Sequence, residues 1–277
     1  MLDISMTRLH EMTVVLYALS VLLYFVDFLH NNQKANKFAF WLLAIVWFLQ
    51  TIFLFLYMQQ TGRFPVLTLF EGLYFYVWVL ITLSLCINKF LKTDFIVFFT
   101  NVLGFILMAV HTFAPVQFES RVLAQQLMSE LLLIHITMAI LAYGAFTLSF
   151  VLSILYLIQY DLLKRKKWGK RLIRLGDLAK LEQWSYLLNV IGVPILFFGL
   201  VLGIQWANMK LPELSWFDTK VIGSLVMLLC YSLYIYVRVR KQVYGRQLAY
   251  WNIASFLIVL INFFLFGSLS GFHYWNT

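Results

Sequence analysis

Charge is scarce in this sequence of 277 residues. Asp, Glu, Lys and Arg make up 12% of the chain, whereas 62% is hydrophobic. Soluble domains carry roughly a quarter of their residues as charged side chains. The shortage excludes a soluble globular protein, and no soluble domain, internal repeat or low-complexity tract interrupts the apolar pattern. The expected class is an integral membrane protein.

Motifs for phosphate binding and metal-dependent hydrolysis are missing as well. The sequence has no Gly-rich phosphate loop, no Walker motif and no HExxH. Its two cysteines, Cys86 and Cys230, lie in apolar runs without a partner at metal-ligand spacing, which favours small buried side chains over a metal site. These absences exclude an ABC ATPase subunit and a two-component sensor.

Eight apolar runs are long enough to cross a membrane as helices. About 20 residues of helix cross a hydrocarbon core of about 30 Å, and a helix satisfies its own backbone hydrogen bonds in lipid. We therefore predict an all-α, polytopic helical bundle that forms a single integral membrane domain of residues 1–277. The expected spans are about 12–29, 38–58, 69–88, 95–114, 131–160, 184–205, 218–238 and 250–272.

The loops between these spans differ in their content of Lys and Arg. When alternate loops are assigned to the same side, most of the 21 basic residues fall on one side. The positive-inside rule places that side in the cytoplasm and both termini outside. The net charge of +9 is then explained by topology, and nucleic acid is not an expected partner. The basic residues on the outer side are Arg8, Arg63, Arg121, Lys210 and Lys220.

The largest basic segment is the predicted cytoplasmic loop 161–183. Apolar residues recur in it at helical spacing among Lys and Arg. This composition is typical of a segment that lies on the membrane surface and binds anionic lipid. A docking site for a cytoplasmic partner is the alternative.

Ionisable groups are nearly absent from the middle of the predicted spans. Asp27, Glu71 and Asp218 all lie near span ends. Transporters usually carry such groups along their pathway, so an ion-coupled transporter is disfavoured.

Four of the five histidines fall on the predicted outer side: His10, His111, His135 and His273. Imidazoles at one membrane face suit the axial ligation of heme iron. A single interfacial histidine is more often a structural residue, and periodicity alone does not choose a pair among the four.

Residues 206–220, WANMKLPELSWFDTK, are unusually aromatic for a loop between two spans. With the span that follows, this stretch resembles the tryptophan-rich outer loop of the cytochrome c assembly family, the CcsA/ResC group of heme-handling membrane proteins. Three further stretches agree in order: Phe64-Pro65 to Glu71, IHITMAILAYG around His135, and NFFLFGSLSGFHYW near the end of the chain. The loop positions that match the family are Gly203, Trp206, Ala207, Asn208, Asp218 and Lys220.

The resemblance implies that heme b is held at the outer face by the two histidines that flank the loop. Carried over to this sequence, these iron ligands are His135 and His273, while His10 and His111 have no family counterpart. Lys210, Lys220 and Arg121 are candidates to pair with the propionates. The resemblance assigns the following further residues to cofactor binding: Trp206, Asn208, Trp216, Phe217 and Asp218.

The loop also departs from the family pattern. The family's PKET corresponds to 219–222 here, while Tyr236 and Arg63 stand where synthetase members carry histidines. These losses disfavour a cytochrome c synthase, and no enzymatic activity is expected. The chain is closer to the HemX branch, whose members are associated with heme biosynthesis genes and described as lowering the level of glutamyl-tRNA reductase.

We therefore predict a bacterial plasma-membrane protein that binds or senses heme and influences tetrapyrrole synthesis. Membrane lipids and proteins of heme biosynthesis are the expected partners. The alternative is a cytochrome c biogenesis component that delivers heme to apocytochrome together with a second membrane protein. A third possibility is a transporter of heme or another amphiphile.

Overall fold

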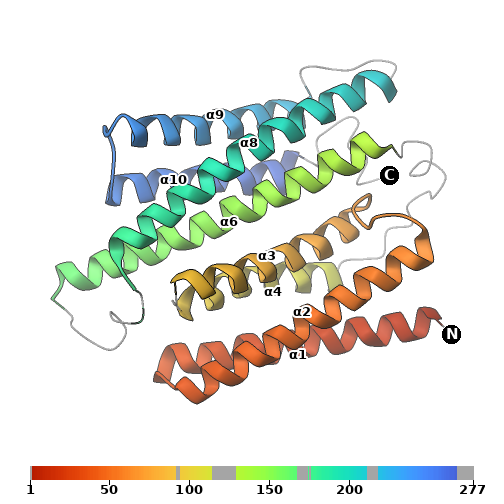
Figure 1. The fold of residues 1–277 in the computed structure, drawn as a ribbon, viewed down its shortest axis with the longest axis horizontal. Coiled ribbons are helices and arrows are strands. Elements are labelled where there is room, and N and C mark those ends of the chain that lie inside the picture. The colour runs from red at the N-terminus through yellow and green to blue at the C-terminus, as the bar shows by residue number, and fades with distance from the viewer. Residues whose placement is uncertain are drawn as a thin grey trace. The chain divides into compact units, whose positions relative to one another are not determined.

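The computed structural model describes residues 2–91, 94–113, 129–166, 174, 176–210 and 218–266 (Figure 1). The regular elements in these ranges are all helical. Eight of the helices are long and apolar enough to cross a membrane. The predicted all-α membrane bundle is thereby confirmed, while the orientation of the termini stays a prediction.

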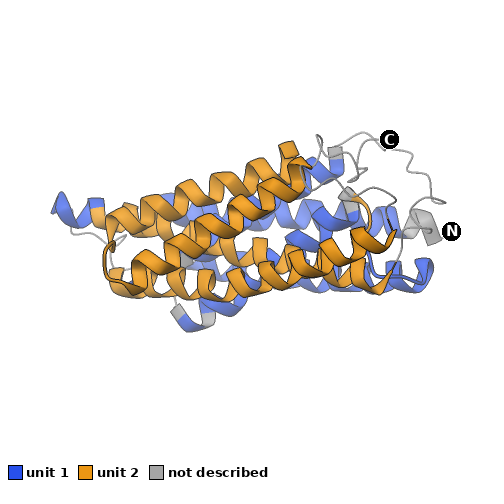
Figure 2. Cartoon of the chain, turned by 90° about the horizontal axis from the view of Figure 1, so that it is seen from above, with its two compact units in different colours: residues 1–65, 70–114, 161–177 blue, residues 66–69, 115–160, 178–277 orange. Residues whose placement is uncertain are grey.

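The chain divides into two compact units, which Figure 2 colours separately. Unit 1 contains residues 1–65, 70–114 and 161–177. Unit 2 contains residues 66–69, 115–160 and 178–277. The basic loop predicted at 161–183 is therefore shared between them.

Unit 1 is built from four helices around an apolar core. They are α1 (Leu2–His30), α2 (Gln33–Thr61), α3 (Leu69–Leu91) and α4 (Asp94–Phe113). The turn between α1 and α2 is short because the Asn32 side chain accepts hydrogen bonds from the Lys34 and Ala35 amides and so caps α2. The core between these helices includes Tyr17, Leu43, Val77, Ile81 and Met108.

Buried ion pairs join helices at both ends of unit 1. At one end the Arg63 guanidinium donates to both oxygens of Glu71, at 2.7 and 2.8 Å, and Tyr57 donates to the same carboxylate. At the other end Arg174 donates to both oxygens of Asp27. Both carboxylates are buried. Bidentate pairs of this kind fix geometry as well as neutralise charge.

Unit 2 is built from α6 (Glu130–Lys164), α8 (Leu178–Lys210), α9 (Thr219–Val239) and α10 (Arg246–Leu260). Of the described helices, α6 and α8 are the longest. Helix α10 continues into a single π-helical turn, η1 (Ile261–Leu265). At 35 residues α6 is about 52 Å long, in line with the long apolar run in the sequence.

Two helices of unit 2 begin several residues earlier than the apolar runs that predicted them. Helix α8 starts at Leu178 rather than near residue 184, and α10 starts at Arg246 rather than near residue 250. Hydropathy detects the part of a helix that suits lipid, whereas the helix itself continues through polar residues until a capping or turn residue ends it.

Neutral polar side chains join the helices in the middle of unit 2. The Asn252 amide donates to the hydroxyls of Ser149, Ser153 and Ser185 and accepts a hydrogen bond from Asn189. All five side chains are buried. Such interhelical bonds hold membrane helices together where the hydrophobic effect does not discriminate between helix and lipid.

An aromatic stack lies in the same unit. The rings of Phe146 and Tyr231 are parallel, with centroids 3.9 Å apart. A Cβ atom at Gly192 would lie 2.6 Å from the Phe146 ring, so only glycine leaves room for this stack. Fully buried aromatic rings therefore fill the interior of unit 2 at this level.

Candidate functional site

One end of unit 2 gathers the described residues that the sequence predicts to bind heme. Helices α6 and α9 begin there, and α8 and η1 end there. We call it the His135 end. His135, Trp206, Asn208 and Asp218 all belong to elements that meet at this end. The other predicted residues lie outside the described part of the chain: His273, Trp216, Phe217 and the propionate candidate Arg121.

His135 is held by the backbone of the neighbouring helix. Its Nδ1 lies 2.6 Å from the carbonyl oxygen of Gly199 on α8. A carbonyl only accepts, so Nδ1 carries the hydrogen and donates it. In the neutral ring the lone pair is then on Nε2. A histidine fixed through Nδ1–H to a backbone carbonyl is a common arrangement for a metal ligand that binds through Nε2.

The ring of His135 also depends on a glycine. A Cβ atom at Gly203 would lie 2.6 Å from both Nδ1 and Cε1 of the imidazole. An added Cβ atom is less disruptive at Gly199, because it would lie 3.3 Å from the Cβ of Met138. The pair of glycines four residues apart, visible in the sequence as a close-packing motif, therefore makes a flat backbone surface against which the imidazole packs.

The last turns of α8 carry the first residues of the tryptophan-rich loop. Trp206 is 7% exposed and Ala207 is 2% exposed, so both pack inside the unit. Asn208 and Lys210 are exposed. Of the two positions predicted for cofactor binding here, Trp206 lies in the interior and Asn208 lies on the surface.

Asp218 begins α9 and caps it. Its carboxylate accepts the backbone N–H of Lys220 at 2.9 Å, and the side chain is buried. The Lys220 ammonium donates to the backbone carbonyl of Asn262 at 2.8 Å and lies over the Phe263 ring. A carboxylate at a helix N-terminus is stabilised by the helix dipole. Asp218 therefore has a structural role in addition to any contact with a ligand.

Asn262, in the π-helical turn, is a residue of this end that the sequence did not assign to the site. Its side-chain amide donates to the hydroxyls of Tyr143 on α6 and Ser224 on α9. Single π-turns occur frequently at functional sites. The sequence shows Asn262 only as an isolated polar residue in an apolar run. That it bonds to helices 119 and 38 residues away is visible only in the structure.

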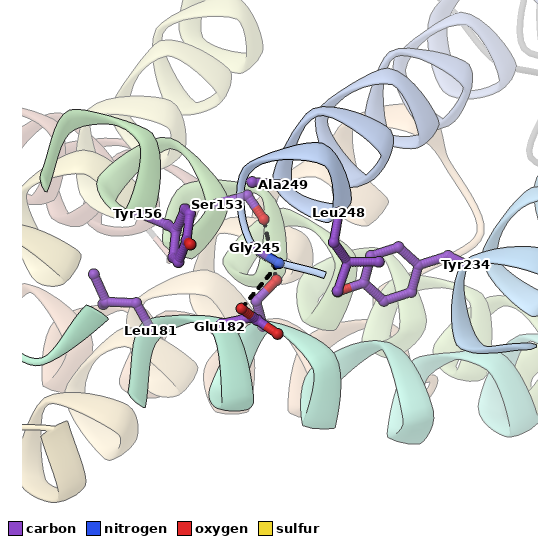
Figure 3. A pocket seen from close by; sticks show the side chains of 9 residues that line it. Ser153, Tyr156, Leu181, Glu182, Tyr234, Gly245, Leu248 and Ala249 are labelled. Atoms are coloured by element: carbon purple, nitrogen blue, oxygen red, sulfur yellow. Dashed lines mark hydrogen bonds between the residues drawn. The ribbon is translucent and has the colours of Figure 1, made fainter. Parts of the chain in front are cut away.

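A small cavity lies elsewhere in unit 2, at the end where α8 and α10 begin (Figure 3). Ser153, Glu182, Tyr234 and Gly245 line it, and the Glu182 carboxylate accepts the Gly245 N–H. Its volume is about 10 Å³. This is room for about one water molecule, so the cavity is not a heme site.

Comparison with known proteins decides the family. The model of the family described as cytochrome c assembly protein matches residues 66–273. The chain belongs to the cytochrome c assembly protein family. This membership, with the eight apolar helices, makes it a multi-pass membrane protein.

Relatives within the cytochrome c assembly family fall into two groups. The chain is 59% identical to Protein HemX of Bacillus subtilis (strain 168) over 276 residues, which covers 100% of both chains. It is 44% identical to Protein HemX of Brevibacillus brevis, over 96% of this chain and 97% of the relative. It is 27% identical to the cytochrome c biogenesis protein CcsA of Mesostigma viride, over 79% of this chain and 76% of the relative.

The family match covers only part of the chain. It includes positions 135, 206, 218 and 273 of the candidate site, and it does not include α1 and α2. The His135 end therefore lies within the part of the chain that the cytochrome c assembly family shares.

Proposed function

We propose that the protein binds heme b at the His135 end of unit 2, with His135 and His273 as the two axial ligands. The observation that carries this proposal is the hydrogen bond from His135 Nδ1 to the Gly199 carbonyl. It fixes the ring and leaves the lone pair on Nε2, the state in which neutral imidazole ligates iron. When bound, the heme supplies an iron centre that accepts two such nitrogens.

The residues around His135 suit the rest of a heme. We propose Trp206, which packs inside the unit at this end, as an aromatic wall of the heme site. The Lys220 ammonium is bonded to a backbone carbonyl and has no ion pair among the described residues, so it is available to pair with a propionate. We propose Asn208, Trp216, Phe217 and Asp218 as further residues of the cofactor site.

The proposed role is that of a HemX-type protein which senses or holds heme and influences tetrapyrrole synthesis, as a negative effector of the level of glutamyl-tRNA reductase. The two HemX relatives, similar along nearly the whole chain, support this role. We place the protein in the bacterial plasma membrane with both termini outside. Cytoplasmic heme-biosynthesis proteins and anionic lipid are then the proposed partners of the loop 161–183.

A second candidate is delivery of heme to apocytochrome during cytochrome c biogenesis. The CcsA relatives support it, and so does the family match, which includes the region around His135 and residue 273. A transporter is less well supported, since the Phe146–Tyr231 stack fills the interior of unit 2 with packed rings.

Heme binding is tested on the full chain in detergent. We expect the purified protein to take up heme with a Soret band of a six-coordinate bis-histidine complex. His135→Ala and His273→Ala should each shift the band and weaken retention of heme. His30→Ala, at the far end of α1, is the control and should leave the spectrum unchanged. An unchanged Soret band in both site variants would rule out the ligand assignment.

A pair of glycine variants tests the placement of the ring. Gly203→Ala puts a methyl group 2.6 Å from the imidazole and should weaken heme binding. Gly199→Ala meets the Cβ of Met138 at 3.3 Å, which a shift of a few tenths of an ångström relieves, and should bind heme more tightly than Gly203→Ala. Equal losses in the two variants would show that the backbone surface under His135 does not position the ligand.

Deletion of the gene in the native host separates the two roles. Raised glutamyl-tRNA reductase with normal holocytochrome c supports the HemX-type role. Loss of holocytochrome c, restored by the wild-type gene but not by His135→Ala, supports heme delivery instead.

A further inference from the structure

Two histidines of unit 1, 101 residues apart in the sequence, meet at one end of the unit. The rings of His10 on α1 and His111 on α4 have centroids 5.0 Å apart and an interplanar angle of 53°. Tyr74 and Phe53 pack around them. The centroid of the Tyr74 ring lies 5.9 Å from that of His10 and 5.7 Å from that of His111. Neither histidine has a role in the proposed heme site.

The hydrogen bonds define the state of His10. Its Nε2 lies 3.3 Å from the hydroxyl of Thr112, and that hydroxyl donates its single hydrogen to the carbonyl of Met108. The Thr112 oxygen therefore accepts, and His10 Nε2 carries the hydrogen. The lone pair of the neutral ring is then on Nδ1, which is buried and has no hydrogen-bond partner. A buried acceptor without a partner costs free energy unless a ligand uses it.

The distance between the rings indicates which ligand fits. With a metal–nitrogen bond of about 2.0 Å and about 1.2 Å from nitrogen to ring centroid, two imidazoles at a tetrahedral angle have centroids about 5.2 Å apart. The observed separation is 5.0 Å. Opposed axial ligands on a heme would need about 6.4 Å by the same lengths. The ring separation is therefore compatible with one metal ion shared at a bent angle, and it is too short for a heme between the rings.

The remaining side chains narrow the kind of metal. No group of three or more His, Cys, Asp or Glu gathers at a common point within the described residues. Glu11, next to His10, forms an exposed ion pair with Arg8. Glu71, the buried carboxylate at this end of unit 1, is already neutralised by Arg63. A divalent ion is therefore disfavoured and a monovalent one is preferred.

Two buried methionines lie one helical turn from the histidines. Met6 precedes His10 by four residues and Met108 precedes His111 by three, so each shares a helix face with its histidine. Thioether sulfur together with imidazole is a ligand set that selects Cu⁺.

We propose that His10 and His111, with Met6 and Met108 as neighbouring thioether donors, form a site in unit 1 that binds a cuprous ion. This site is independent of the heme proposal, because it uses other residues in the other unit.

The test uses the full-length protein in detergent under anaerobic conditions. Cu⁺ is supplied from a complex with bicinchoninate, a chelator whose colour reports transfer. We expect the wild type to withdraw one Cu⁺ per chain and the His10→Phe/His111→Phe variant to lose about 100-fold in affinity. Met108→Leu should lose less than the double variant, and His30→Phe is the matched control, since His30 is exposed at the opposite end of α1.

X-ray absorption of the loaded protein gives a second readout. Scattering from both nitrogen at about 2.0 Å and sulfur at about 2.3 Å supports the mixed ligand set. Thermal denaturation of the variants confirms that they are folded. The proposal is overturned if the wild type binds Cu⁺ no better than the folded double variant, or if Zn²⁺ binds through the histidine pair and Cu⁺ does not.

Discussion

Unit 1 closes both of its ends with buried ion pairs, whereas unit 2 leaves the His135 end without one among its described residues. In unit 1 the side chains of Arg63 and Glu71 are 19% and 7% exposed, and those of Arg174 and Asp27 are 11% and 2% exposed. The described ion pair of unit 2, Arg238–Glu182, lies at the opposite end from His135 and is 32% and 19% exposed.

The difference in ion pairing determines whether charged groups at each end remain available for a ligand. An Arg–carboxylate pair neutralises both of its charges, so Arg63 and Arg174 have little residual attraction for an anionic ligand. At the His135 end the ammonium of Lys220 meets a backbone carbonyl, and the Asp218 carboxylate is bonded to a backbone N–H. The cation is thus held in place but not neutralised by a bidentate partner. We infer that the His135 end retains capacity for an anionic ligand at some cost in stability.

The largest effect is expected when the ion pair of unit 1 is broken. Arg63→Met leaves the buried Glu71 carboxylate without its guanidinium, and removal of one partner of a buried pair costs about 3–5 kcal/mol. Denaturation of the purified protein in detergent measures this loss. Adding Glu71→Gln removes the stranded charge and keeps an oxygen for Tyr57, so most of the stability should return. A double variant as unstable as the single one would show that the pair is not the source of the loss.

Lys220→Met tests whether the Lys220 ammonium at the His135 end binds an anionic ligand such as a heme propionate. Loss of one charge-assisted hydrogen bond to a propionate is worth about 1.5–3 kcal/mol, so heme affinity should fall by about 10-fold or more. The heme-free protein loses the hydrogen bond to the Asn262 carbonyl and the contact with the Phe263 ring, so its stability is measured alongside the heme affinity. Lys210→Met, on the exposed last turn of α8, is the matched control. A heme titration followed in the Soret region measures both, and equal affinities would remove Lys220 from the site.

Asn252→Ala probes the neutral bonds in the middle of unit 2. The amide joins α10 to hydroxyls on α6 and α8. Bonds between membrane helices are worth about 0.6 kcal/mol each, so the loss should be about 1–2 kcal/mol in the same denaturation assay. Asn101→Ala in unit 1 removes the acceptor of the Tyr17 hydroxyl and the amide donor to the Ser84 oxygen, and it should cost a similar amount. A much larger loss for only one of the two variants would mean that the units differ in their interiors and not only at their ends.

Much of this fold follows from the sequence because lipid imposes a simple rule. Runs of about 20 apolar residues predicted all eight spans, since any spanning segment must satisfy its own backbone. The ends were less accurate, because polar residues such as those at 178–183 continue a helix beyond its apolar part. His135 was found through a family resemblance, whereas its hydrogen bond to Gly199 was not predicted. That contact depends on how α6 packs against α8, which no local pattern encodes.

The pairing of His10 with His111 shows the same limit. Each is a single imidazole near a helix end, and neither has a motif around it. Only the packing of α1 against α4 brings their rings together. For the same reason no partner of Asn262 was predictable from the sequence, although this side chain joins three elements of unit 2.

The smallest effect is expected for Arg238→Met, which removes the ion pair of unit 2. Its guanidinium lies 3.0 Å from Glu182, and the side chain is 32% exposed, more than those of Arg63 and Arg174. Solvent therefore screens the attraction more, and the loss should stay below about 1 kcal/mol. Glu182 also keeps the Gly245 N–H after the change. Denaturation midpoints measured beside Arg63→Met give the ratio of the two losses. If Arg238→Met lowers the free energy of unfolding as much as Arg63→Met does, burial does not distinguish the ion pairs of the two units. The contrast between the ends of unit 1 and the His135 end would then not rest on buried ion pairs.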